Sequence, residues 1–371
     1  MHRIPLVLLV LGLATGCLGG AGSLTPCDSN AADSSICSLT NPEDIGFSPA
    51  RDWIIVSEMG PNESNGESED AMTRRGRLTA IRIADLGRRL LYPLDQASKL
   101  TGSREGDWGD VNCPGEPDSA KFGPHGIDVG VRMTGETVIA VVNHGGREAI
   151  ELFEWVDRDG PALVWRGCVP MIPGRSANDV ALMPGDGFVV TNFMPAFEGV
   201  SMKAIWTLVK MSFGGRTGSV LRWQPGMGFE EIENSGGSAP NGVSASADGS
   251  QIFVAEWGGE SIYRLRLSED GPAQRDEIRV EQNPDNLTWM RDGRLLVAGQ
   301  HGGISAALGC ASVQNAGCDI GYSVYVIDPE PLTATRLFEG RGAASVALEV
   351  ADEVFVGFFV GDQIERVSIS D

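Results

Sequence analysis

The sequence predicts an all-β fold, a six-bladed β-propeller built from four-stranded antiparallel blades. Three observations support this prediction: long helical periodicity is scarce, short apolar runs alternate with turn residues, and one strand–turn–strand plan occurs six times. The 371 residues are enough for one large β domain, and 49 glycines interrupt the apolar runs.

The six repeats share an apolar strand, a tight turn and a second apolar strand, and all but the last begin with a polar residue. They are EDIGFSPARDWIIVSEMG from Glu43, HGIDVGVRMTGETVIAVVNHGG from His125, NDVALMPGDGFVVTNFMP from Asn178, NGVSASADGSQIFVAEWGG from Asn241, DNLTWMRDGRLLVAGQHGG from Asp285 and ASVALEVADEVFVGFFVGD from Ala344. One such segment alone is only a β-hairpin. Because six of them follow one another at the spacing of four-stranded units, radially arranged blades are the better interpretation.

The interval between the first and second repeats is the longest. It contains LTAIRIADLGRRLLYPL, from Leu78, which we expect to supply the outer strands of the first blade. We expect the acidic stretch that follows, up to Phe122, to be a loop. No segment has the composition of an interdomain linker, so residues 43–371 are predicted to form one domain.

The N-terminus has the pattern of a bacterial export signal. Residues 1–16 contain Arg3 and then an apolar run that is too short for a membrane span, which needs about 20 residues. Ala14-Thr15-Gly16-Cys17 resembles a lipoprotein cleavage site. Cys17 would then be lipidated, and the protein would be anchored in the outer membrane. Because leucine is commoner than Ala14 at its position, ordinary secretion to the periplasm or the outside is the alternative. Residues 17–42 are interpreted as a leader that contains Cys27 and Cys37.

The remaining cysteines indicate the compartment of the protein, and the net charge limits its possible partners. Six cysteines besides Cys17 suggest disulfides in an oxidising compartment. Cys27–Cys37 and Cys310–Cys318 would close short loops and leave Cys113–Cys168, although other pairings remain open. The net charge of −21 disfavours nucleic acid and anionic lipid as partners. Membrane association is therefore expected only through a lipid anchor.

In a propeller the first strand of each blade lines the central tunnel, so the leading residues converge on one mouth. The oxygen-bearing residues among them are Glu43, Asn178, Asn241, Asp285 and Asn286. Two carboxylates and three amides suit calcium, which accepts about 6–8 oxygens, and the absence of cysteine from this set argues against zinc. Asn and Asp at strand starts also cap turns, and singly each residue favours that reading. As a set from separate blades they predict a catalytic calcium ion.

Asp44 and Asp179 each follow a member of this set. Since successive strand residues point to opposite faces, both carboxylates are expected to turn away from the first ion and into the tunnel. Buried carboxylates without compensation would be costly. We therefore predict a second, structural calcium ion.

Two of the four histidines lie at opposite ends of one predicted hairpin. Counting outward from the turn at Thr134 and Gly135 pairs His125 with His144, beside the predicted cation. One histidine could then take a proton from water while the other orients it or relays the proton. A lone histidine at a strand end is more often a surface residue, but a registered pair favours catalysis. The same counting places His301 at this rim, where we expect it to line the pocket.

Several motifs carry a family likeness: Glu43-Asp44-Ile45, Pro124-His125-Gly126-Ile127, Val141-Val142-Asn143-His144, Asn178-Asp179-Val180, Asn241-Gly242-Val243 and Asp285-Asn286-Leu287. In this order they resemble the calcium-dependent paraoxonase/arylesterase family, relatives of the gluconolactonase-like six-bladed propellers. The resemblance implies hydrolysis of lactones or aryl esters. It also implies residue roles, which are catalytic calcium ligands at Glu43, Asn178, Asn241, Asp285 and Asn286, structural calcium ligands at Asp44, Asp179 and the backbone carbonyl of Ile127, and a general-base pair at His125 and His144.

The chain departs from the family pattern in two places. Asn192-Phe193-Met194-Pro195 stands where relatives often have Asn-Asp-His-Tyr, so the pocket wall at Asn192 and Phe193 should be more apolar. No cysteine follows Cys318, so the disulfide that ties the chain ends together in relatives is absent.

Three alternatives remain to be weighed. A sugar lactonase of the gluconolactonase type would use the same ion without a histidine pair. A calcium-stabilised propeller could bind a ligand or protein without catalysis. A lyase-like relative, similar to strictosidine synthase, would be expected to lack the calcium ligands, and none is missing here.

Overall fold

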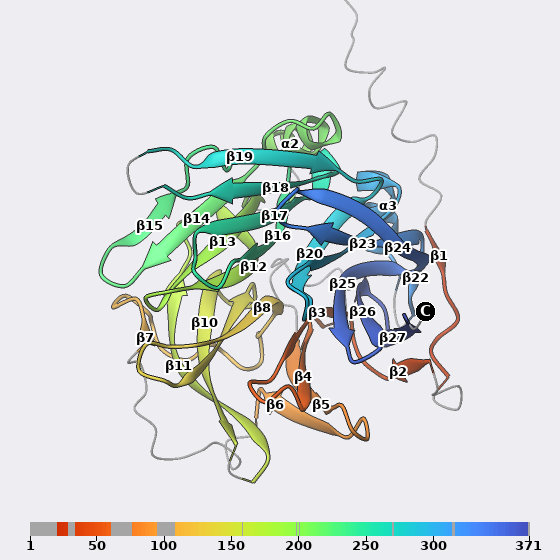
Figure 1. Cartoon of the computed structure of the whole chain (residues 1–371), viewed down its shortest axis with the longest axis horizontal. Coiled ribbons are helices and arrows are strands. Elements are labelled where there is room, and N and C mark those ends of the chain that lie inside the picture. The colour runs from red at the N-terminus through yellow and green to blue at the C-terminus, as the bar shows by residue number, and fades with distance from the viewer. Residues whose placement is uncertain are drawn as a thin grey trace, which may run out of the picture.

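The computed structural model describes residues 21–28, 34–60, 76–94, 108–157, 159–197, 199, 201–268, 271–313 and 316–369. Six sheets, antiparallel except for the pairing of one short strand, surround a central axis, and the chain passes from one blade to the next around it (Figure 1). The predicted six-bladed propeller is confirmed.

Each blade runs from an innermost strand at the axis to an outermost strand at the rim. The strands are β3 (Pro42–Phe47), β4 (Trp53–Glu58), β5 (Arg77–Arg82) and β6 (Arg88–Tyr92) in blade 1; β8 (Pro124–Val131), β9 (Thr137–Asn143), β10 (Ala149–Asp157), β11 (Pro161–Pro170) and β7 (Trp108–Gly109) in blade 2; β12 (Arg175–Met183), β13 (Gly187–Pro195), β14 (Ser219–Gln224) and β15 (Gly228–Glu231) in blade 3; β16 (Pro240–Ala245), β17 (Gln251–Glu256), β18 (Ser261–Arg266) and β19 (Gln274–Arg279) in blade 4; β20 (Asn283–Trp289), β21 (Leu295–Gln300), β23 (Gly321–Asp328) and β24 (Thr333–Arg341) in blade 5; and β25 (Ala343–Val350), β26 (Glu353–Val360), β27 (Gln363–Ser368) and β2 (Ser35–Cys37) in blade 6.

The core lies between neighbouring blades, which explains why the second strands are apolar on both faces. In β4, Ile54 packs in a cluster with Val346 of blade 6. The next residue, Ile55, packs in a cluster with Ile139 and Val141 of blade 2. Because alternate side chains of a strand point to opposite faces, a strand between two blades needs apolar residues at every position.

The outer part of blade 2 differs from the prediction. Within the stretch expected to be a loop, β7 pairs in parallel with β11, with Trp108 opposite Gly167. The Trp108 ring is buried against Val138 and lies under the guanidinium of Arg132, 4.4 Å from the ring centroid. The expectation of a loop is therefore wrong at Trp108 and Gly109, where strand pairing accompanies burial of the Trp108 ring.

Blade 6 closes the ring by joining the two ends of the described chain. Its outermost strand, β2, lies within the segment 17–42 and pairs antiparallel with β27, so that Ile36 lies opposite Ile364. Disulfides join Cys27 to Cys37, Cys113 to Cys168 and Cys310 to Cys318. This is the pairing favoured by loop length, and it is confirmed.

The inner strand of every blade has a β-bulge near its start. The register shifts between Pro42 and Asp44, Pro124 and Ile127, Ala177 and Val180, Pro240 and Val243, Pro284 and Leu287, and Ala344 and Val346. A bulge leaves its residues out of the ladder and re-aims their side chains. The polar residues predicted to converge on the tunnel lie within these bulges.

Short helices cover the rim at which the inner strands begin. They are α2 (Met202–Ser212), after β13; η3 (Trp257–Gly259), after β17; and α3 (Gly303–Cys310), after β21. The Ser201 hydroxyl caps α2 by accepting a hydrogen bond from the Ala204 N–H at 3.1 Å. Among the described helices, none has the length and apolar character needed to cross a bilayer. Near α3, the short strand β1 (Gly22–Ser23) pairs with β22 (Cys318–Asp319).

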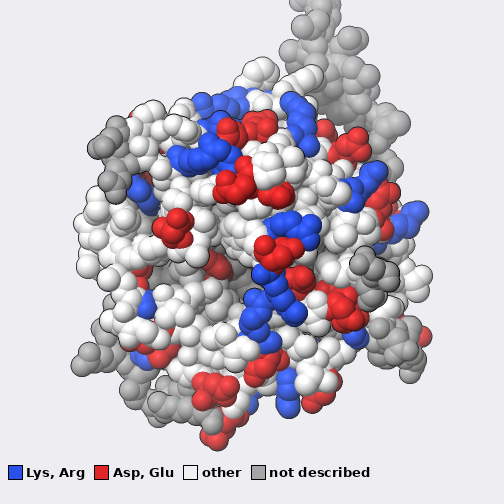
Figure 2. All heavy atoms as spheres, in the orientation of Figure 1, with Lys and Arg blue, Asp and Glu red and all other residues white. Residues whose placement is uncertain are grey.

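Charged side chains of both signs lie on the face of the molecule drawn in Figure 2. Figure 2 shows acidic and basic side chains interspersed over this face, without a large area of one sign. The net charge of −21 is therefore not concentrated there in one acidic surface.

Candidate active site

A cavity of about 270 Å³ opens at the tunnel mouth, between the starts of the inner strands and the rim helices. Its polar lining residues are Glu43, His125, Asn178, Asn241, Asp285 and Gln300. Its apolar lining residues are Met59, Phe193, Met194, Leu208, Met211, Trp257, Ile304, Ala307, Leu308 and Phe359. The polar residues come from the strands and many of the apolar ones from the rim helices, so a polar floor lies under apolar walls.

The side chains of the floor hold one another in place. Asn286 Nδ2 donates to Glu43 Oε1 at 2.8 Å, which joins blade 5 to blade 1. The Asn241 side chain hydrogen-bonds to Asp285 in the next blade. Burial, and next the charge of Glu43, raise the pKa of Asp285 well above its ordinary range.

Three amide oxygens of this cluster are buried without a hydrogen-bond partner. The Oδ1 atoms of Asn178, Asn241 and Asn286 accept no hydrogen bond from any described residue. Leaving a buried acceptor unsatisfied costs about 1–3 kcal/mol. Three such oxygens in one cluster, from three blades, therefore indicate a site that a further group completes.

The cluster fits a hard cation. Three amide oxygens and the carboxylates of Glu43 and Asp285 are the ligand types that calcium prefers. In the part of the chain that the structure describes, no three His, Cys, Asp or Glu side chains gather as they do in zinc centres. The fit therefore depends on the amides as much as on the carboxylates.

Asp44 and Asp179 lie deeper in the tunnel and bridge neighbouring blades. Asp44 Oδ2 accepts from the Ile127 N–H at 2.7 Å, and Asp179 Oδ2 accepts from the Val243 N–H at 2.7 Å. Burial raises the pKa of both carboxyls well above the ordinary range, followed by the charge of Glu43 for Asp44 and that of Asp44 for Asp179. A cation between these acidic groups would offset their repulsion, and each oxygen retains a second lone pair with which to bind it.

Gly126 is required by this arrangement. A Cβ atom at position 126 would lie 2.3 Å from Asp179 Oδ1 and 2.6 Å from Asp179 Cα. Only a glycine lets blades 2 and 3 approach this closely, which explains its place in the bulge after His125.

The two predicted histidines are in contact. His125 Nδ1 lies 2.9 Å from His144 Nε2, and His125 Nε2 lies 3.4 Å from Glu43 Oε1. Their register is not the regular pairing expected from the turn, because Ile127 pairs with Val141 and Pro124 with Asn143. The bulge releases His125 from the ladder, and its ring then reaches His144.

Two functional residues escaped the sequence reasoning. Glu148 Oε2 lies 2.8 Å from His144 Nδ1. Gln300 Nε2 donates to Asp285 Oδ2 at 2.5 Å, while Gln300 Oε1 accepts from Trp257 Nε1 at 2.8 Å. A signal was present for Gln300, because it is the last residue of the second strand of blade 5 and directly precedes HGG, a motif that resembles the HGG and WGG after the second strands of blades 2 and 4.

Of the other predicted site residues, some line the cavity at the tunnel mouth and others do not. Phe193 lines the cavity, whereas Asn192 is buried behind it and accepts from the Ser176 N–H at 3.2 Å. His301 Nε2 lies 2.8 Å from Ser323 Oγ, and the residue lines a separate cavity with Glu260. Residues 1–16 and Cys17 lie outside the described residues.

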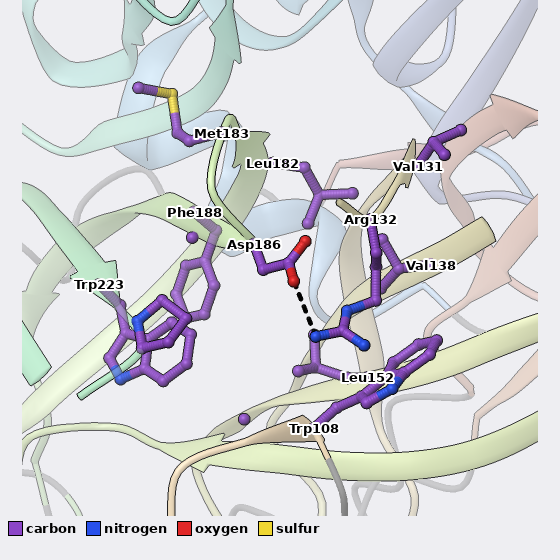
Figure 3. A pocket seen from close by; sticks show the side chains of 13 residues that line it. Trp108, Val131, Arg132, Val138, Leu152, Leu182, Met183, Asp186, Phe188 and Trp223 are labelled. Atoms are coloured by element: carbon purple, nitrogen blue, oxygen red, sulfur yellow. Dashed lines mark hydrogen bonds and ion pairs between the residues drawn. The ribbon is translucent and has the colours of Figure 1, made fainter. Parts of the chain in front are cut away.

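A second pocket, of about 110 Å³, lies between blades 2 and 3 (Figure 3). Aromatic rings, including those of Trp108, Phe188 and Trp223, line it, and an ion pair of 2.8 Å between Arg132 and Asp186 crosses it. None of the predicted site residues lines this pocket.

Fold and site together define a six-bladed propeller with an imidazole-containing polar pocket on its axis. The model of the arylesterase family matches residues 91–366, and the chain belongs to this family. The family match supports a hydrolase of the lactonase or esterase type. The matched segment includes the whole polar floor except Glu43, which precedes it.

Solved structures confirm the architecture. A gluconolactonase from Xanthomonas campestris is 15% identical, with a TM-score of 0.50 over 94% of this chain and 98% of that chain. A luciferin-regenerating enzyme is 12% identical, with a TM-score of 0.52 over 90% of this chain and 92% of that chain. At such identities the likeness shows the fold alone. A comparison with curated proteins finds no match.

Proposed function

We propose that the protein is a calcium-dependent hydrolase of lactones or aryl esters. The observation that carries this proposal is the set of buried amide oxygens at Asn178, Asn241 and Asn286, which have no partner among the described residues, together with a pair of histidines in contact. Asn178, Asn241 and His125 line one cavity, which is large enough for a small ester. The family match supports the same reaction class.

Five residues would hold the catalytic ion: Glu43, Asn178, Asn241, Asp285 and Asn286. When bound, calcium supplies a Lewis acid that polarises the ester carbonyl and offsets the negative charge that develops on its oxygen. Gln300 keeps Asp285 oriented through the 2.5 Å hydrogen bond.

The histidine pair activates water. His125 Nε2 takes a proton from a water molecule as the water oxygen bonds to the carbonyl carbon. His144 holds the other ring nitrogen of His125 at 2.9 Å, so the ring keeps its orientation while it carries the proton. The proton is then delivered to the leaving oxygen when the C–O bond breaks.

The walls favour substrates with an apolar part. Phe193, Leu208, Met211 and Ile304 lie above the polar floor and offer no side-chain hydrogen bond to a sugar hydroxyl. This lining makes a sugar lactone the less suitable substrate.

Further elements of the proposal concern the deeper ion and the location of the protein. Asp44 and Asp179, with the carbonyl of Ile127, would hold a second, structural calcium ion.

Three disulfides fit an oxidising compartment. The protein would therefore be exported, either lipidated at Cys17 in the outer membrane or released to the periplasm or the outside. Intact mass of the mature N-terminus distinguishes these two forms.

The experiment is a hydrolysis screen of the purified, calcium-loaded protein. We expect turnover of phenyl acetate or of alkyl-substituted γ- and δ-lactones, its loss on chelation with EDTA, and its return when calcium is added back. Elemental analysis should find two calcium ions per chain. Preferential turnover of gluconolactone would indicate the sugar lactonase. No calcium-dependent turnover of any substrate would leave the non-catalytic binding propeller.

A further inference from the structure

Glu148 is a partly buried carboxylate at the far end of the histidine pair. It lies in the connection between β9 and β10, and its side chain is 14% exposed. Oε2 lies 2.8 Å from His144 Nδ1, and Oε1 accepts from the Ala177 N–H at 2.7 Å. The neighbouring Arg147 is paired with Glu151 through two hydrogen bonds of 2.7 Å, so its charge is directed elsewhere.

With an ionised Glu148 and two neutral imidazoles, these contacts define one place for each proton in the relay. An ionised carboxylate only accepts hydrogen bonds, so His144 must carry its proton on Nδ1. Its Nε2 is then an acceptor, and the 2.9 Å contact requires the proton of neutral His125 on Nδ1. His125 Nε2, the nitrogen on the Glu43 side, is left as a proton acceptor.

We propose that Glu148 is a positioning residue that sets the tautomer of both histidines and thereby makes His125 Nε2 the base. This inference rests on the proposed function and adds a third member to its proton relay. The carboxylate also favours the imidazolium that forms when the relay takes up a proton. Through Ala177 it joins the relay to the strand that carries Asn178, so the base and the cation cluster keep their relative positions.

The variant Glu148→Gln tests the proton placement in particular. The Ala177 N–H requires the amide oxygen of the glutamine, which leaves the amide NH₂ facing His144 Nδ1. His144 would then carry its proton on Nε2, His125 would carry its own on Nε2, and the relay would be reversed. Because His125 could no longer accept a proton from water, we expect kcat to fall by about 10²–10⁴-fold, which is the usual contribution of a general base.

The second readout is independent of hydrolysis. In ¹⁵N-labelled, calcium-loaded protein above neutral pH, long-range ¹H–¹⁵N spectra report which ring nitrogen is protonated. We expect the Nδ1–H form for His125 and His144 in the wild type and the Nε2–H form in Glu148→Gln. Glu148→Asp, which keeps the charge, should retain the wild-type tautomers and part of the activity. KM and calcium affinity should change little in either variant.

The matched control is Glu154→Gln, in the same blade, where the carboxylate pairs with Arg166 away from the cavity. It should leave both kcat and the histidine spectra unchanged. Wild-type kcat in Glu148→Gln, or wild-type tautomers in that variant, would overturn the inference. Loss of calcium binding with unchanged tautomers would also overturn it. A wild-type protein that hydrolyses no ester would refute the proposed function instead, and the tautomers would still decide the role of Glu148.

Discussion

At the scale of single residues, the amides of the cluster distinguish a cation site from ordinary strand caps. A capping Asn uses its side-chain oxygen to accept a backbone N–H. Asn178, Asn241 and Asn286 leave that oxygen without a partner among the described residues. Their burial is therefore unfavourable in the metal-free protein, and under the proposed function a bound cation would make it favourable.

This reasoning predicts a change of sign in stability for Asn178→Ala. In EDTA the variant loses an unsatisfied buried oxygen. Its free energy of unfolding should therefore equal that of the wild type or exceed it by up to about 1–3 kcal/mol, and its Tm should be equal or higher. In millimolar calcium it lacks a ligand, so its Tm should be lower. Calorimetry in both buffers measures the difference.

Asn283→Ala is the control for this prediction. Asn283 Oδ1 accepts from the Gly303 N–H and its Nδ2 donates to the Trp257 carbonyl, both at 2.9 Å. Its loss should lower Tm by a similar amount in both buffers. An Asn178→Ala variant that is destabilised equally in both would contradict a metal role for Asn178.

The sequence allowed the cluster to be predicted but not its supports. Glu43, Asn178 and Asn241 occupy corresponding positions in repeats, and corresponding positions meet at the axis. Glu148 lies in the connection between β9 and β10, where repeat position carries less information, whereas Gln300 ends β21 and was marked only by the HGG that follows it. Acidic side chains number 50 in the chain, so the contact of Glu148 with His144 could be found only in three dimensions.

At the scale of elements, the inner strands are joined by aspartates that repeat from blade to blade. Asp44, Asp128 and Asp179 each accept the N–H of the following residue. Each also accepts an N–H from the inner strand of the next blade, at Ile127, Leu182 and Val243 respectively, at 2.7 Å. Asp44 and Asp179 are also predicted calcium ligands, and the bond to the next blade is a role that repeat position alone does not indicate.

Asp128 gives a prediction for the pH dependence of stability. Burial raises the pKa of Asp128 from 3.8 to about 6. Its folded pKa lies above the unfolded value, so its contribution to stability is full below pH 4 and is lost as the pH rises through 6. Over this window the loss is on the order of 3 kcal/mol.

Urea unfolding of the wild type and Asp128→Asn at pH 4 and pH 7 measures this contribution. The amide of Asp128→Asn cannot ionise and has one acceptor fewer, so it changes the free energy of unfolding by an amount that does not depend on pH. We therefore expect the free energy of unfolding of the wild type, relative to that of the variant, to be higher at pH 4 than at pH 7. An equal difference at the two pH values would show that Asp128 does not titrate in this range.

Strands formed by distant pairing were the elements that the sequence did not reveal. The inner hairpins have local turns and alternating apolar residues, and they were predicted. In contrast, β2 and β7 are two or three residues long and pair with β27 and β11 far along the chain. No local pattern distinguishes such short edge strands from loops.

At the scale of the whole molecule, ring closure connects the N-terminal segment to the active site. Ile36 of β2 is 3% exposed and packs with Leu39 and Ile364 in the outer part of blade 6. At the axis of the same blade, Ser345 Oγ donates to the Glu43 carbonyl at 2.6 Å. Closure of the ring therefore holds Glu43, a proposed cation ligand, against the last blade.

Ile36→Ala should weaken both the ring and the site. Truncation of a buried Ile costs about 2–5 kcal/mol, measured as a lower urea midpoint. Because Glu43 is anchored to blade 6, calcium affinity measured by titration calorimetry in the folded range should fall as well. Leu337→Ala, a change at a 40% exposed position in the outermost strand of blade 5, is the control and should alter neither quantity appreciably. If Ile36→Ala lowers the midpoint but leaves calcium affinity unchanged, then Glu43 is held by its own blade alone and closure serves stability only.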